Sequence, residues 1–378
     1  MRYFSLITAF FFLVNLSTAI AEVDPWYEQN PSCVIDRGNP ARTGEYKTEP
    51  LEKFHKIIWK KEVKGRLTPL CFNNFIIIAG PAVWNFAKNQ QVWGENNKYN
   101  LTGFTLYKNI LYSTFLSSSN LHNLIGYDVK TGTIIFKESF GKNNAVSLSP
   151  LIYNDIIYLP LNETLLAYSL TDKTILWQVP FNISNQLSTD GQNLYTYRFD
   201  TKSTVAINLK TGKESWSSPI EPNGYISLYK GKAFIASCEK INDQVLGKVY
   251  ALNAKTGKVF WSFVLSSCTN MPNLAITNDK VFALDYKKLH ALDINTGKEL
   301  WYFPQKLREF PSIAGNTVYV RSAELIYAID SETGKLKSKY PIKTLNYYDG
   351  MLGSIVPYQR QLLLNSAFIH SDRVIVVN

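Results

Sequence analysis

Residues 288–303 read KLHALDINTGKELWYF and predict a β-hairpin. Two short apolar runs flank the turn Asn295-Thr296-Gly297. Glycine tolerates the positive φ that a tight hairpin requires, and Asn, Asp and Thr side chains bond to the turning backbone. The chain carries six copies of this pattern. They lie at residues 123–138, 164–179, 203–218, 248–263, 288–303 and 325–340.

Each copy has the same markers in the same order. A small residue precedes the turn, Thr-Gly forms the turn in five copies, and an outer-strand residue, usually aromatic, follows it. The turn glycines are Gly132, Gly212, Gly257, Gly297 and Gly334. With two degenerate early copies and a serine in the weak last copy, the anchors of the repeat are Trp59, Trp93, Phe136, Trp177, Trp216, Trp261, Trp301 and Ser338.

The anchors recur about every 40 residues, and such a period with four short strands per unit is typical of a β-propeller blade. A four-stranded sheet cannot bury both faces alone, so each blade requires neighbours. A large aromatic side chain on the outer strand can lie across the next blade, and the small residue leaves room for it. Eight anchors therefore predict an all-β, eight-bladed propeller of four-stranded antiparallel blades.

Seven blades follow one another, and the eighth is divided between the two ends of the chain. Residues 54–64 alternate and contain Trp59, so they resemble an outer strand without its blade. The three missing strands lie within residues 350–378. Joining them closes the ring and removes two open sheet edges. The other blades are expected at residues 66–94, 100–139, 145–180, 185–219, 224–264, 270–304 and 308–341.

The first 21 residues have the pattern of a secretory signal peptide. Arg2 precedes an apolar run, and Ala19-Ile20-Ala21 forms a cleavage site. No later stretch reaches the roughly 18 apolar residues of a membrane span, and no cysteine stands at the cleavage point for a bacterial lipid anchor. We expect a periplasmic or secreted protein with a signal peptide (1–21), an extended leader (22–53) and a propeller (54–378).

Four cysteines are present, an even number that an exported chain can oxidise. Cys238 ends a strand of one blade and Cys268 precedes the next blade, so these two could meet. Cys33 in the leader could then pair with Cys71. Four buried free thiols are the alternative, and the sequence leaves both open. No zinc site is expected, because the four histidines are scattered and no Cys-x-x-Cys occurs.

The formal net charge is +10, and many of the lysines lie in the hairpin turns. Equivalent turns of a propeller emerge on one face. Attraction to an anionic envelope surface is one interpretation of such a face, and a solvated rim that keeps the protein soluble is the other. Nucleic acid is not an expected partner, because the exported chain lacks clusters of basic and aromatic residues.

The loops that lead into the blades are the expected recognition elements, because a rigid ring presents them together. Arg and aromatic residues are enriched at interface anchors. The candidate partner-binding residues are Arg308, Phe310, Tyr347, Tyr348, Asp349, Tyr225 and Asn270. No catalytic, cofactor-binding or metal-binding residues are identified, since the chain has no nucleophile elbow, phosphate loop or dinucleotide fingerprint.

The unit A-L-D-x-x-T-G-K-x-x-W, at residues 291–301, resembles the repeat of the pyrroloquinoline-quinone-like (PQQ-like) β-propeller family. The leader segment at residues 37–44 resembles one that often precedes the first blade in that family. The resemblance covers the chain from Cys33 to its end. It implies one of two branches: quinoprotein dehydrogenases that hold PQQ and calcium, or non-enzymatic periplasmic propellers such as the outer-membrane β-barrel assembly scaffold.

The sequence departs from both branches. It lacks the adjacent cysteines that are typical of the dehydrogenases, and it lacks the lipidated cysteine of the assembly scaffold. The resemblance favours a non-enzymatic scaffold without a cofactor, a single ring that binds a protein partner within an envelope complex. A PQQ-dependent dehydrogenase and an envelope or carbohydrate-binding module are the alternatives.

Overall fold

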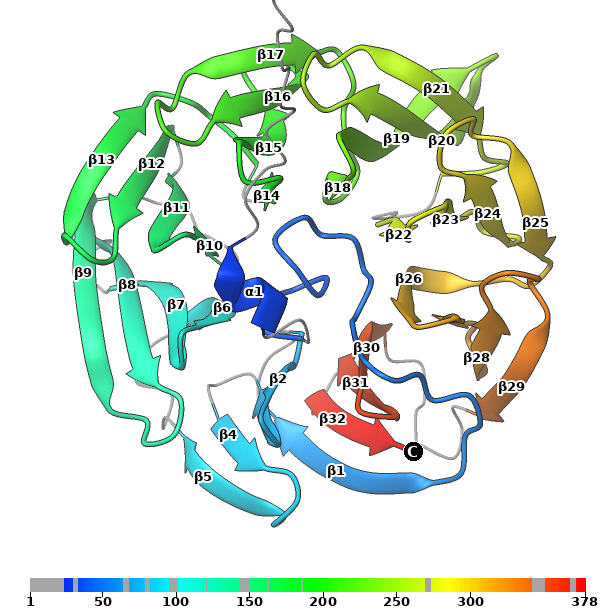
Figure 1. Cartoon of the computed structure of the whole chain (residues 1–378), viewed down its shortest axis with the longest axis horizontal. Helices are drawn as coiled ribbons and strands as arrows, with labels where there is room; N and C mark the ends of the chain where they lie inside the picture. The colour runs from blue at the N-terminus through cyan, green and yellow to red at the C-terminus, as the bar shows by residue number, and fades with distance from the viewer. Residues whose placement is uncertain are drawn as a thin grey trace, which may run out of the picture.

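The computed structural model describes residues 24–29, 33–63, 68–78, 82–94, 101–117, 119, 121–142, 150–161, 163–184, 186–268, 273–341, 351–367 and 372–378. In these ranges the chain forms eight four-stranded antiparallel sheets and one short helix, α1 (Pro25–Gln29). The sheets stand as blades around a central axis (Figure 1). The prediction of an eight-bladed β-propeller is confirmed. The expected signal peptide lies outside the described residues.

The first four blades run consecutively along the chain, each from its innermost strand to its outermost. In blades two to four the middle strands are buried along almost their whole length because neighbouring blades cover both faces. The strands are β2 (Leu70–Phe72), β3 (Phe75–Ile78), β4 (Ala82–Asn85) and β5 (Gln90–Gly94); β6 (Leu101–Tyr107), β7 (Ile110–Leu116), β8 (Leu121–Asp128) and β9 (Ile134–Lys142); β10 (Leu151–Tyr153), β11 (Ile156–Leu161), β12 (Thr164–Ser169) and β13 (Thr174–Val179); β14 (Ser188–Thr189), β15 (Asn193–Arg198), β16 (Ser203–Asn208) and β17 (Glu214–Ser218).

Blades five to seven follow in the same manner. Blade five has the longest hairpin, which extends beyond the matching strands of its neighbours. The strands are β18 (Ser227–Tyr229), β19 (Lys232–Ile241), β20 (Gln244–Asn253) and β21 (Val259–Val264); β22 (Ala275–Ile276), β23 (Lys280–Leu284), β24 (Leu289–Asp293) and β25 (Glu299–Phe303); β26 (Arg308–Ala314), β27 (Thr317–Arg321), β28 (Leu325–Asp330) and β29 (Leu336–Pro341).

Blade eight joins the two ends of the chain. Strands β30 (Met351–Tyr358), β31 (Gln361–Ala367) and β32 (Asp372–Val377) come from the C-terminus, and β1 (Ile57–Val63) adds the outer strand from the N-terminal side. Trp59 lies opposite Val376 in the antiparallel register. The predicted closure of the ring is therefore confirmed, and both ends of the ring are paired rather than exposed.

The repeated tryptophans join neighbouring blades. In blade five, Trp261 on β21 lies directly opposite Ala251 on β20, and this small side chain leaves room for the indole. The indole N–H donates to the carbonyl of Ile294 in the next blade at 3.2 Å. A Cβ on Gly297, which has φ of +70°, would lie 2.5 Å from the same indole. Glycine is therefore required for two reasons, the left-handed backbone and the close approach of the ring.

The same contact recurs at four other junctions. In each of them the indole N–H of one blade donates to a turn carbonyl of the next blade, and the turn glycine lies under the ring. The indole and glycine pairs are Trp93 with Gly132, Trp177 with Gly212, Trp216 with Gly257, and Trp301 with Gly334. The prediction that the aromatic residue lies across the next blade is confirmed.

The junction between blades two and three has Phe136 in place of the tryptophan. The phenylalanine ring has no N–H to donate, and the residue precedes blade three, whose turn has Lys173 at the positive-φ position in place of glycine. The lysine adopts φ of +56° in that turn. Both the indole and the turn glycine are thus absent at this junction. At the junction of blades eight and one the indole of Trp59 is present, but the positive-φ turn residue is Asn89, whose side chain accepts the indole N–H at 2.9 Å.

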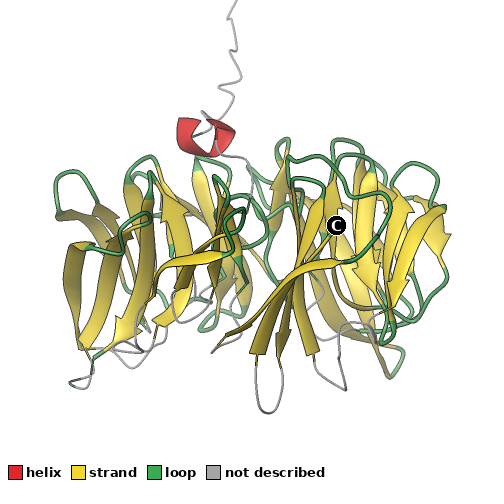
Figure 2. Cartoon of the chain, turned by 90° about the horizontal axis from the view of Figure 1, so that it is seen from below, coloured by secondary structure: helices red, strands yellow, loops and turns green. Residues whose placement is uncertain are grey.

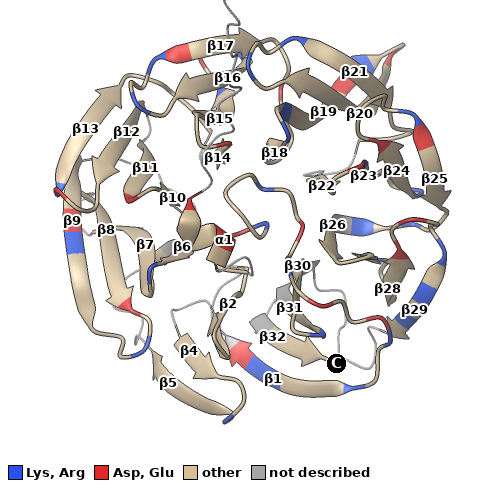
Figure 3. Ribbon diagram, in the orientation of Figure 1, with Lys and Arg blue, Asp and Glu red and all other residues tan. Residues whose placement is uncertain are grey.

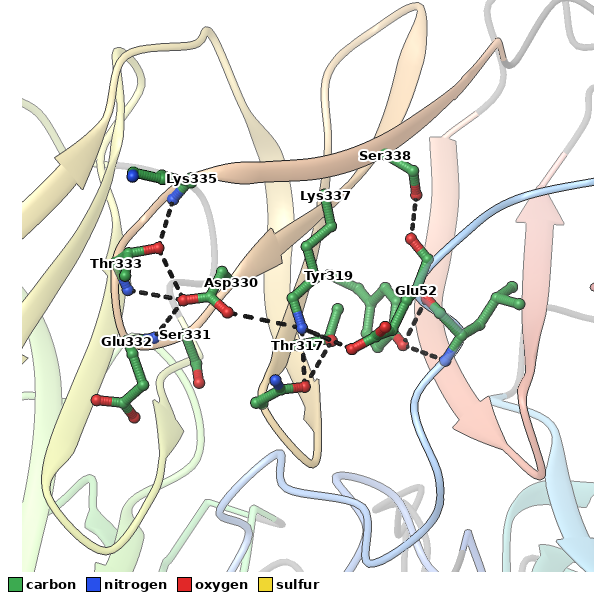
Figure 4. Close-up of polar contacts among 12 residues, drawn as sticks. Glu52, Thr317, Tyr319, Asp330, Ser331, Glu332, Thr333, Lys335, Lys337 and Ser338 are labelled. Atoms are coloured by element: carbon green, nitrogen blue, oxygen red, sulfur yellow. Dashed lines mark hydrogen bonds and ion pairs between the residues drawn. The ribbon is translucent and has the colours of Figure 1, made fainter.

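The junction between blades seven and eight has a serine, Ser338, where the repeat has tryptophan. There the segment before β1 lies between blades seven and eight, with Leu51 packed against both (Figure 4). The Ser338 hydroxyl donates to the Glu52 carbonyl at 2.6 Å, and the Lys337 ammonium lies 2.9 Å from the Glu52 carboxylate. The Tyr319 hydroxyl donates to the Leu51 carbonyl at 3.0 Å and accepts from the Leu51 N–H.

Candidate functional site on the ring axis

An irregular segment of the chain occupies the axis of the ring. We call residues 33–51 the axial segment; Figure 1 shows it as the blue coil inside the blades. Expected from its composition to be an extended leader, it lies inside the propeller. Its buried side chains include Cys33, Val34, Ile35, Tyr46 and Leu51. The axial segment therefore forms part of the core of the ring.

The backbone of the axial segment bonds to the innermost strands of successive blades. Irregular buried backbone requires such partners, because unpaired N–H and C=O groups are costly away from water. The segment thereby satisfies strand edges that would otherwise face the channel. The donor and acceptor pairs are Cys71 to Cys33, Leu106 to Val34, Thr189 to Pro40, Leu228 to Ala41, Ile276 to Thr43, and Ile313 to Gly44.

Blade eight is contacted further along the same segment. The Gln359 N–H donates to the Thr48 hydroxyl at 2.8 Å, and the Arg360 N–H donates to the Glu49 carbonyl at 3.2 Å. Blade three is contacted from α1, where the Tyr27 hydroxyl donates to the Ile152 carbonyl at 2.9 Å. All eight blades thus contact residues 24–51.

Two arginines of the axial segment are almost completely buried. Arg37 is 1% exposed, and its guanidinium donates to the carbonyls of Pro311, at 3.1 Å, and Leu274. Its carbon Cζ lies 5.5 Å from the ring centre of Phe310. Burial lowers the pKa of Arg37 from its usual value. Carbonyl oxygens and an aromatic face thus replace water around this cation.

Arg42 has a matching environment on the side of blades four and five. It is 1% exposed and donates to the carbonyls of Leu187, at 3.1 Å, and Asp36, at 2.5 Å. Its guanidinium lies 4.7 Å from the ring centre of Tyr225. The two arginines therefore connect the axial segment to inner loops on different sides of the ring.

Glycine has a steric role in this segment. Gly44 has φ of +68°, and a Cβ there would overlap the guanidinium of Arg37. Arg37 and Gly44 are thus matched by their packing against each other. The sequence contained this signal, but nothing in it indicated that the partner surface was the inside of the ring.

Helix α1 stands on one face of the ring (Figure 2). Asp24 precedes it and is buried at 2% exposure. Its carboxylate accepts from the Tyr107 hydroxyl at 3.0 Å, the Asn154 N–H at 2.7 Å and the Trp26 N–H at 3.0 Å. Because Asn154 lies in a turn between the first two strands of blade three, α1 is on the face that carries these turns.

The structure places the candidate partner-binding residues in different environments. Arg308 is exposed at the start of β26, and Phe310 is half-buried against Arg37. Tyr225 is 7% exposed beneath Arg42, so its ring contacts the chain itself. Their roles as partner anchors stay predictions. The candidates that lie outside the described residues are Asn270, Tyr347, Tyr348 and Asp349.

Both expected disulfides are present. Cys33 pairs with Cys71, with Cα atoms 5.1 Å apart, and Cys238 pairs with Cys268, with Cα atoms 5.5 Å apart. The first ties the axial segment to blade one. The second ties the long hairpin of blade five to the connection that leads to blade six. The alternative of four free thiols is thereby excluded.

A buried cluster of polar side chains in blade six was not predicted. The His290 ring lies between two carboxylates, with Nε2 3.1 Å from Asp285 and Nδ1 2.5 Å from Glu299. The Ser266 hydroxyl donates to Asp285 at 2.6 Å. Burial alone would raise the pKa of Asp285, but hydrogen bonds from His290, Ser266 and the Lys287 N–H hold it below its usual range.

This cluster does not have the order of a hydrolase triad. In a triad the serine bonds the imidazole, which removes its proton. Here both ring nitrogens of His290 face carboxylates, and Ser266 bonds the carboxylate of Asp285 instead. The imidazole of His290 does not contact the serine, so the order of the three groups differs from that of a triad.

The comparisons with known proteins agree with this architecture. The family model for outer membrane protein assembly factor BamB matches residues 79–230 and 245–340, more than half of the chain. The chain belongs to this family of PQQ-like repeat β-propellers. Among the described residues, none of the helices is long and apolar enough to span a membrane.

The curated relatives match only part of the chain. An uncharacterized protein of Rickettsia prowazekii (strain Madrid E) is 26% identical over 265 residues, which is 66% of this chain and 58% of the relative. A polyvinylalcohol dehydrogenase of a Pseudomonas species is 33% identical over 97 residues, covering 24% of this chain and 14% of that enzyme. The chain thus spans well under two thirds of the length of these relatives.

Solved structures with the same fold come from both branches. BamB from Moraxella catarrhalis superposes with a TM-score of 0.63 at 17% identity, covering 85% of this chain and 97% of that one. A quinohemoprotein alcohol dehydrogenase from Pseudomonas putida HK5 superposes with a TM-score of 0.68 at 10% identity, covering 95% and 82%. At these identities the similarity demonstrates the fold alone.

Proposed function

We propose that this chain is an exported, non-enzymatic propeller that binds a protein partner in the cell envelope as part of an assembly complex. The proposal follows the family to which the chain belongs, whose model describes an outer membrane protein assembly factor. A single ring would contribute its rigid loops to the complex. The partner would be held by aromatic anchors or by backbone pairing at an open strand edge.

The observation that carries the proposal is the filled axis. Residues 33–46 bond to inner strands around the ring, and the side chains of Arg37 and Arg42 complete the packing. Small-molecule sites are concave, usually preformed clefts. Because its own chain occupies the centre of the ring, the outer faces and loops are the surfaces left for recognition. Such surfaces suit a protein partner.

Export is supported by the cysteines. Cys33–Cys71 and Cys238–Cys268 account for all four cysteines of the chain. Structural disulfides persist in oxidising compartments such as the periplasm and the exterior of the cell, and they are rare in the cytosol. Together with the signal-peptide pattern of residues 1–21, they favour a periplasmic or secreted location.

A PQQ-dependent dehydrogenase is the second candidate, and the fold of the Pseudomonas putida enzyme favours it. Calcium requires six to eight oxygen ligands. In the part of the chain that the structure describes, no group of three or more His, Cys, Asp and Glu side chains could hold a metal ion. The described residues thus offer no cluster of acidic side chains for calcium, and we derive no reaction through the quinone.

The two candidates separate in one assay. The purified protein would be incubated with pyrroloquinoline quinone and calcium, and its absorbance spectrum and dye-linked alcohol oxidation would be measured. We expect no bound quinone spectrum and no dye reduction. Reduction of the dye would overturn the scaffold proposal.

Cross-linking in intact cells tests the scaffold directly. A photoreactive amino acid replaces exposed Arg308, at the start of β26, in one variant. In another it replaces exposed Lys255, in the turn between β20 and β21. We expect at least one variant to capture a discrete envelope protein, identified by mass spectrometry. Failure of both variants to yield any adduct, with the protein exported and folded, would contradict the proposal.

A further inference from the structure

The face that carries α1 also carries two turns from each of several blades. One turn joins the first and second strands, and the other joins the third and fourth. A backbone bond connects the two turns within a blade, as from the Ala254 N–H to the Gly231 carbonyl at 2.9 Å in blade five. The Leu209 N–H makes the same bond to Gln192 in blade four. The outer turns therefore form one repeated surface whose charges can be compared blade by blade.

In four blades the outer turn contains both lysine and acid. The carboxylate that caps the turn, such as Asp128, accepts from two backbone N–H groups of the turn. These turns are therefore close to neutral or acidic. They contain Asp128 and Lys130 in blade two, Asp172 and Lys173 in blade three, Asp293 and Lys298 in blade six, and Asp330, Glu332 and Lys335 in blade seven.

Blades four and five differ in charge and not in geometry. Their outer turns are capped by Asn208 and Asn253, whose amide oxygens accept the same two N–H bonds at 2.8 to 3.1 Å. The turn therefore does not require a carboxylate, and here the neutral amide removes the negative charge. Each of the two turns has two lysines and no acid.

The basic turns lie side by side. The Trp216 indole of blade four donates to the Ala254 carbonyl at 2.8 Å, and its ring covers Gly257 in the turn of blade five. Lys230, in the inner turn of blade five, adjoins them through the Ala254–Gly231 bond. We call these exposed residues the basic patch: Lys210, Lys213, Lys230, Lys255 and Lys258 (Figure 3).

Acidic side chains close to the basic patch have other partners. Glu214 follows Lys213 but lies 3.0 Å from the Arg198 guanidinium. Asp190 accepts from the Tyr195 hydroxyl at 2.6 Å and from the backbone. The five lysines of the patch form no ion pairs with described residues. Like charges held together without neutralisation repel one another, so their positive potential faces solvent.

Exposed apolar side chains and free strand edges border the patch. Val259 and Phe260 directly follow Lys258 and are 48% and 53% exposed. Strands β17 and β21 are the last strands of their sheets, so one edge of each is unpaired within its sheet. The outer turns and outer strands of blades four and five thus provide positive charge, exposed apolar side chains and unpaired backbone hydrogen-bonding groups.

We propose that the basic patch on blades four and five binds an extended acidic segment of a protein partner. The inference rests on the proposed scaffold function and names the chemistry of its partner. A membrane would contact the whole face that carries α1 and the turns, including the carboxylates of blades two, three, six and seven. The outer turn of blade one is also capped by an amide, Asn85, but it carries a single lysine, Lys88. The paired lysines of two adjacent turns in blades four and five suit a narrow acidic segment better than a flat anionic surface.

A charge-matched pair of variants tests the proposal. The probe is a fluorescein-labelled peptide of ten glutamates, with binding followed by fluorescence anisotropy at low and high salt. The patch variant is K210Q/K213Q/K255Q/K258Q, and the control variant K130Q/K173Q/K298Q/K335Q removes the same charge from the outer turns of the other blades. We expect about tenfold weaker, less salt-dependent binding in the patch variant and little change in the control.

A second variant keeps every lysine. N208D/N253D restores the carboxylate cap that blades two, six and seven already use, so the turns are expected to fold normally. It adds negative charge within the patch, and we expect it to weaken peptide binding about as much as two of the lysine substitutions. Circular dichroism would verify that all variants are folded.

Three outcomes would overturn the proposal. They are equal loss of binding in the patch and control variants, no peptide binding by the unmodified protein, and binding to phosphatidylglycerol vesicles that the peptide does not displace. The scaffold itself is tested separately by capture from Arg308. If the patch variant still captures the same partner in cells, the acidic-segment proposal fails and the scaffold stands.

Discussion

The junction between blades five and six and the junction between blades seven and eight are closed by different means. The first uses Trp261 of one blade over Gly297 of the next, a contact whose two halves both belong to the repeat. The second has Ser338 in place of tryptophan and receives Leu51 and Glu52 from the other end of the chain. Repetition thus encodes most junctions, and a distant segment completes the one where the repeat decays.

The difference is also one of chemistry. The tryptophan junction removes a large apolar ring from water and fixes its orientation by one hydrogen bond. The serine junction combines the buried Leu51 side chain with polar contacts: the Lys337 ammonium contacts Asn316 and Thr317 oxygens, at 2.8 and 3.0 Å, as well as Glu52. Exposed ion pairs contribute little to stability. We therefore expect the two junctions to respond very differently to substitution.

Truncation of the indole should have the largest effect. Trp261→Ala removes a ring that is 9% exposed, and losses of a buried aromatic side chain destabilise by about 3–5 kcal/mol. Ser338→Ala at the other junction should cost about 1 kcal/mol, the value of one hydrogen bond. Urea unfolding followed by tryptophan-independent far-ultraviolet circular dichroism measures both. Similar losses in the two variants would refute the contrast.

The glycine half of the contact gives a second, smaller effect with a close control. Gly297 and Gly231 have nearly the same φ, +70° and +72°, but a Cβ meets the Trp261 ring at Gly297 and nothing within 4 Å at Gly231. Gly231→Ala should cost about 1–2 kcal/mol for the left-handed backbone alone. Gly297→Ala should cost a further 1–3 kcal/mol or so for overpacking. Equal unfolding midpoints would show that the indole does not impose the glycine.

The charged cluster of blade six should make its stability depend on pH. Asp285 has a pKa held below its usual range, so its stabilisation is present above about pH 4 and is lost as the pH falls through the lower folded pKa. Asp285→Asn should cost about 1–3 kcal/mol at pH 7. The difference from the unmodified protein should shrink between pH 4 and pH 2. A pH-independent difference would assign the loss to packing instead.

The contact between Tyr319 and Leu51, at the junction of blades seven and eight, should show the smallest loss of stability on substitution. Tyr319→Phe removes the hydroxyl that bonds both the N–H and the carbonyl of Leu51 and should cost about 1 kcal/mol or slightly more. Tyr286→Phe is the control, because Tyr286 is 53% exposed. Hydrogen exchange at residues 51–56 would measure the local opening. Unchanged exchange in Tyr319→Phe would mean that the leader is held by other contacts.

Much of the fold was predictable because its determinants are local. The turn at Asn295-Thr296-Gly297 and the alternation of β24 and β25 are written within about a dozen residues. The count of eight blades and the pairing of β1 with β32 followed from repetition and from the need to close an open sheet. Both cysteine pairs were among the alternatives: the order of the blades suggested Cys238 with Cys268, and Cys33 and Cys71 were the two that remained.

The candidate site was less accessible from sequence. Phe310 and Tyr225 were chosen as aromatic residues in loops that lead into the blades, but the ring of each lies against a buried arginine of the axial segment. The axial segment has no periodicity, because every blade offers it a different partner. The network around His290 was also missed, since Asp285 and Glu299 lie on different strands and only the register brings them together.

The amino-acid sequence by itself determined the repeating unit: strand, turn and aromatic residue, each set by side chains a few positions apart. Only the tertiary structure decided what each unit contacts. It placed the glycine of one blade under the indole of the previous one, drew residues 33–51 into the axis, and gathered the unneutralised lysines of blades four and five. Local patterns act through turn geometry and alternation, whereas these contacts depend on the closure of the ring.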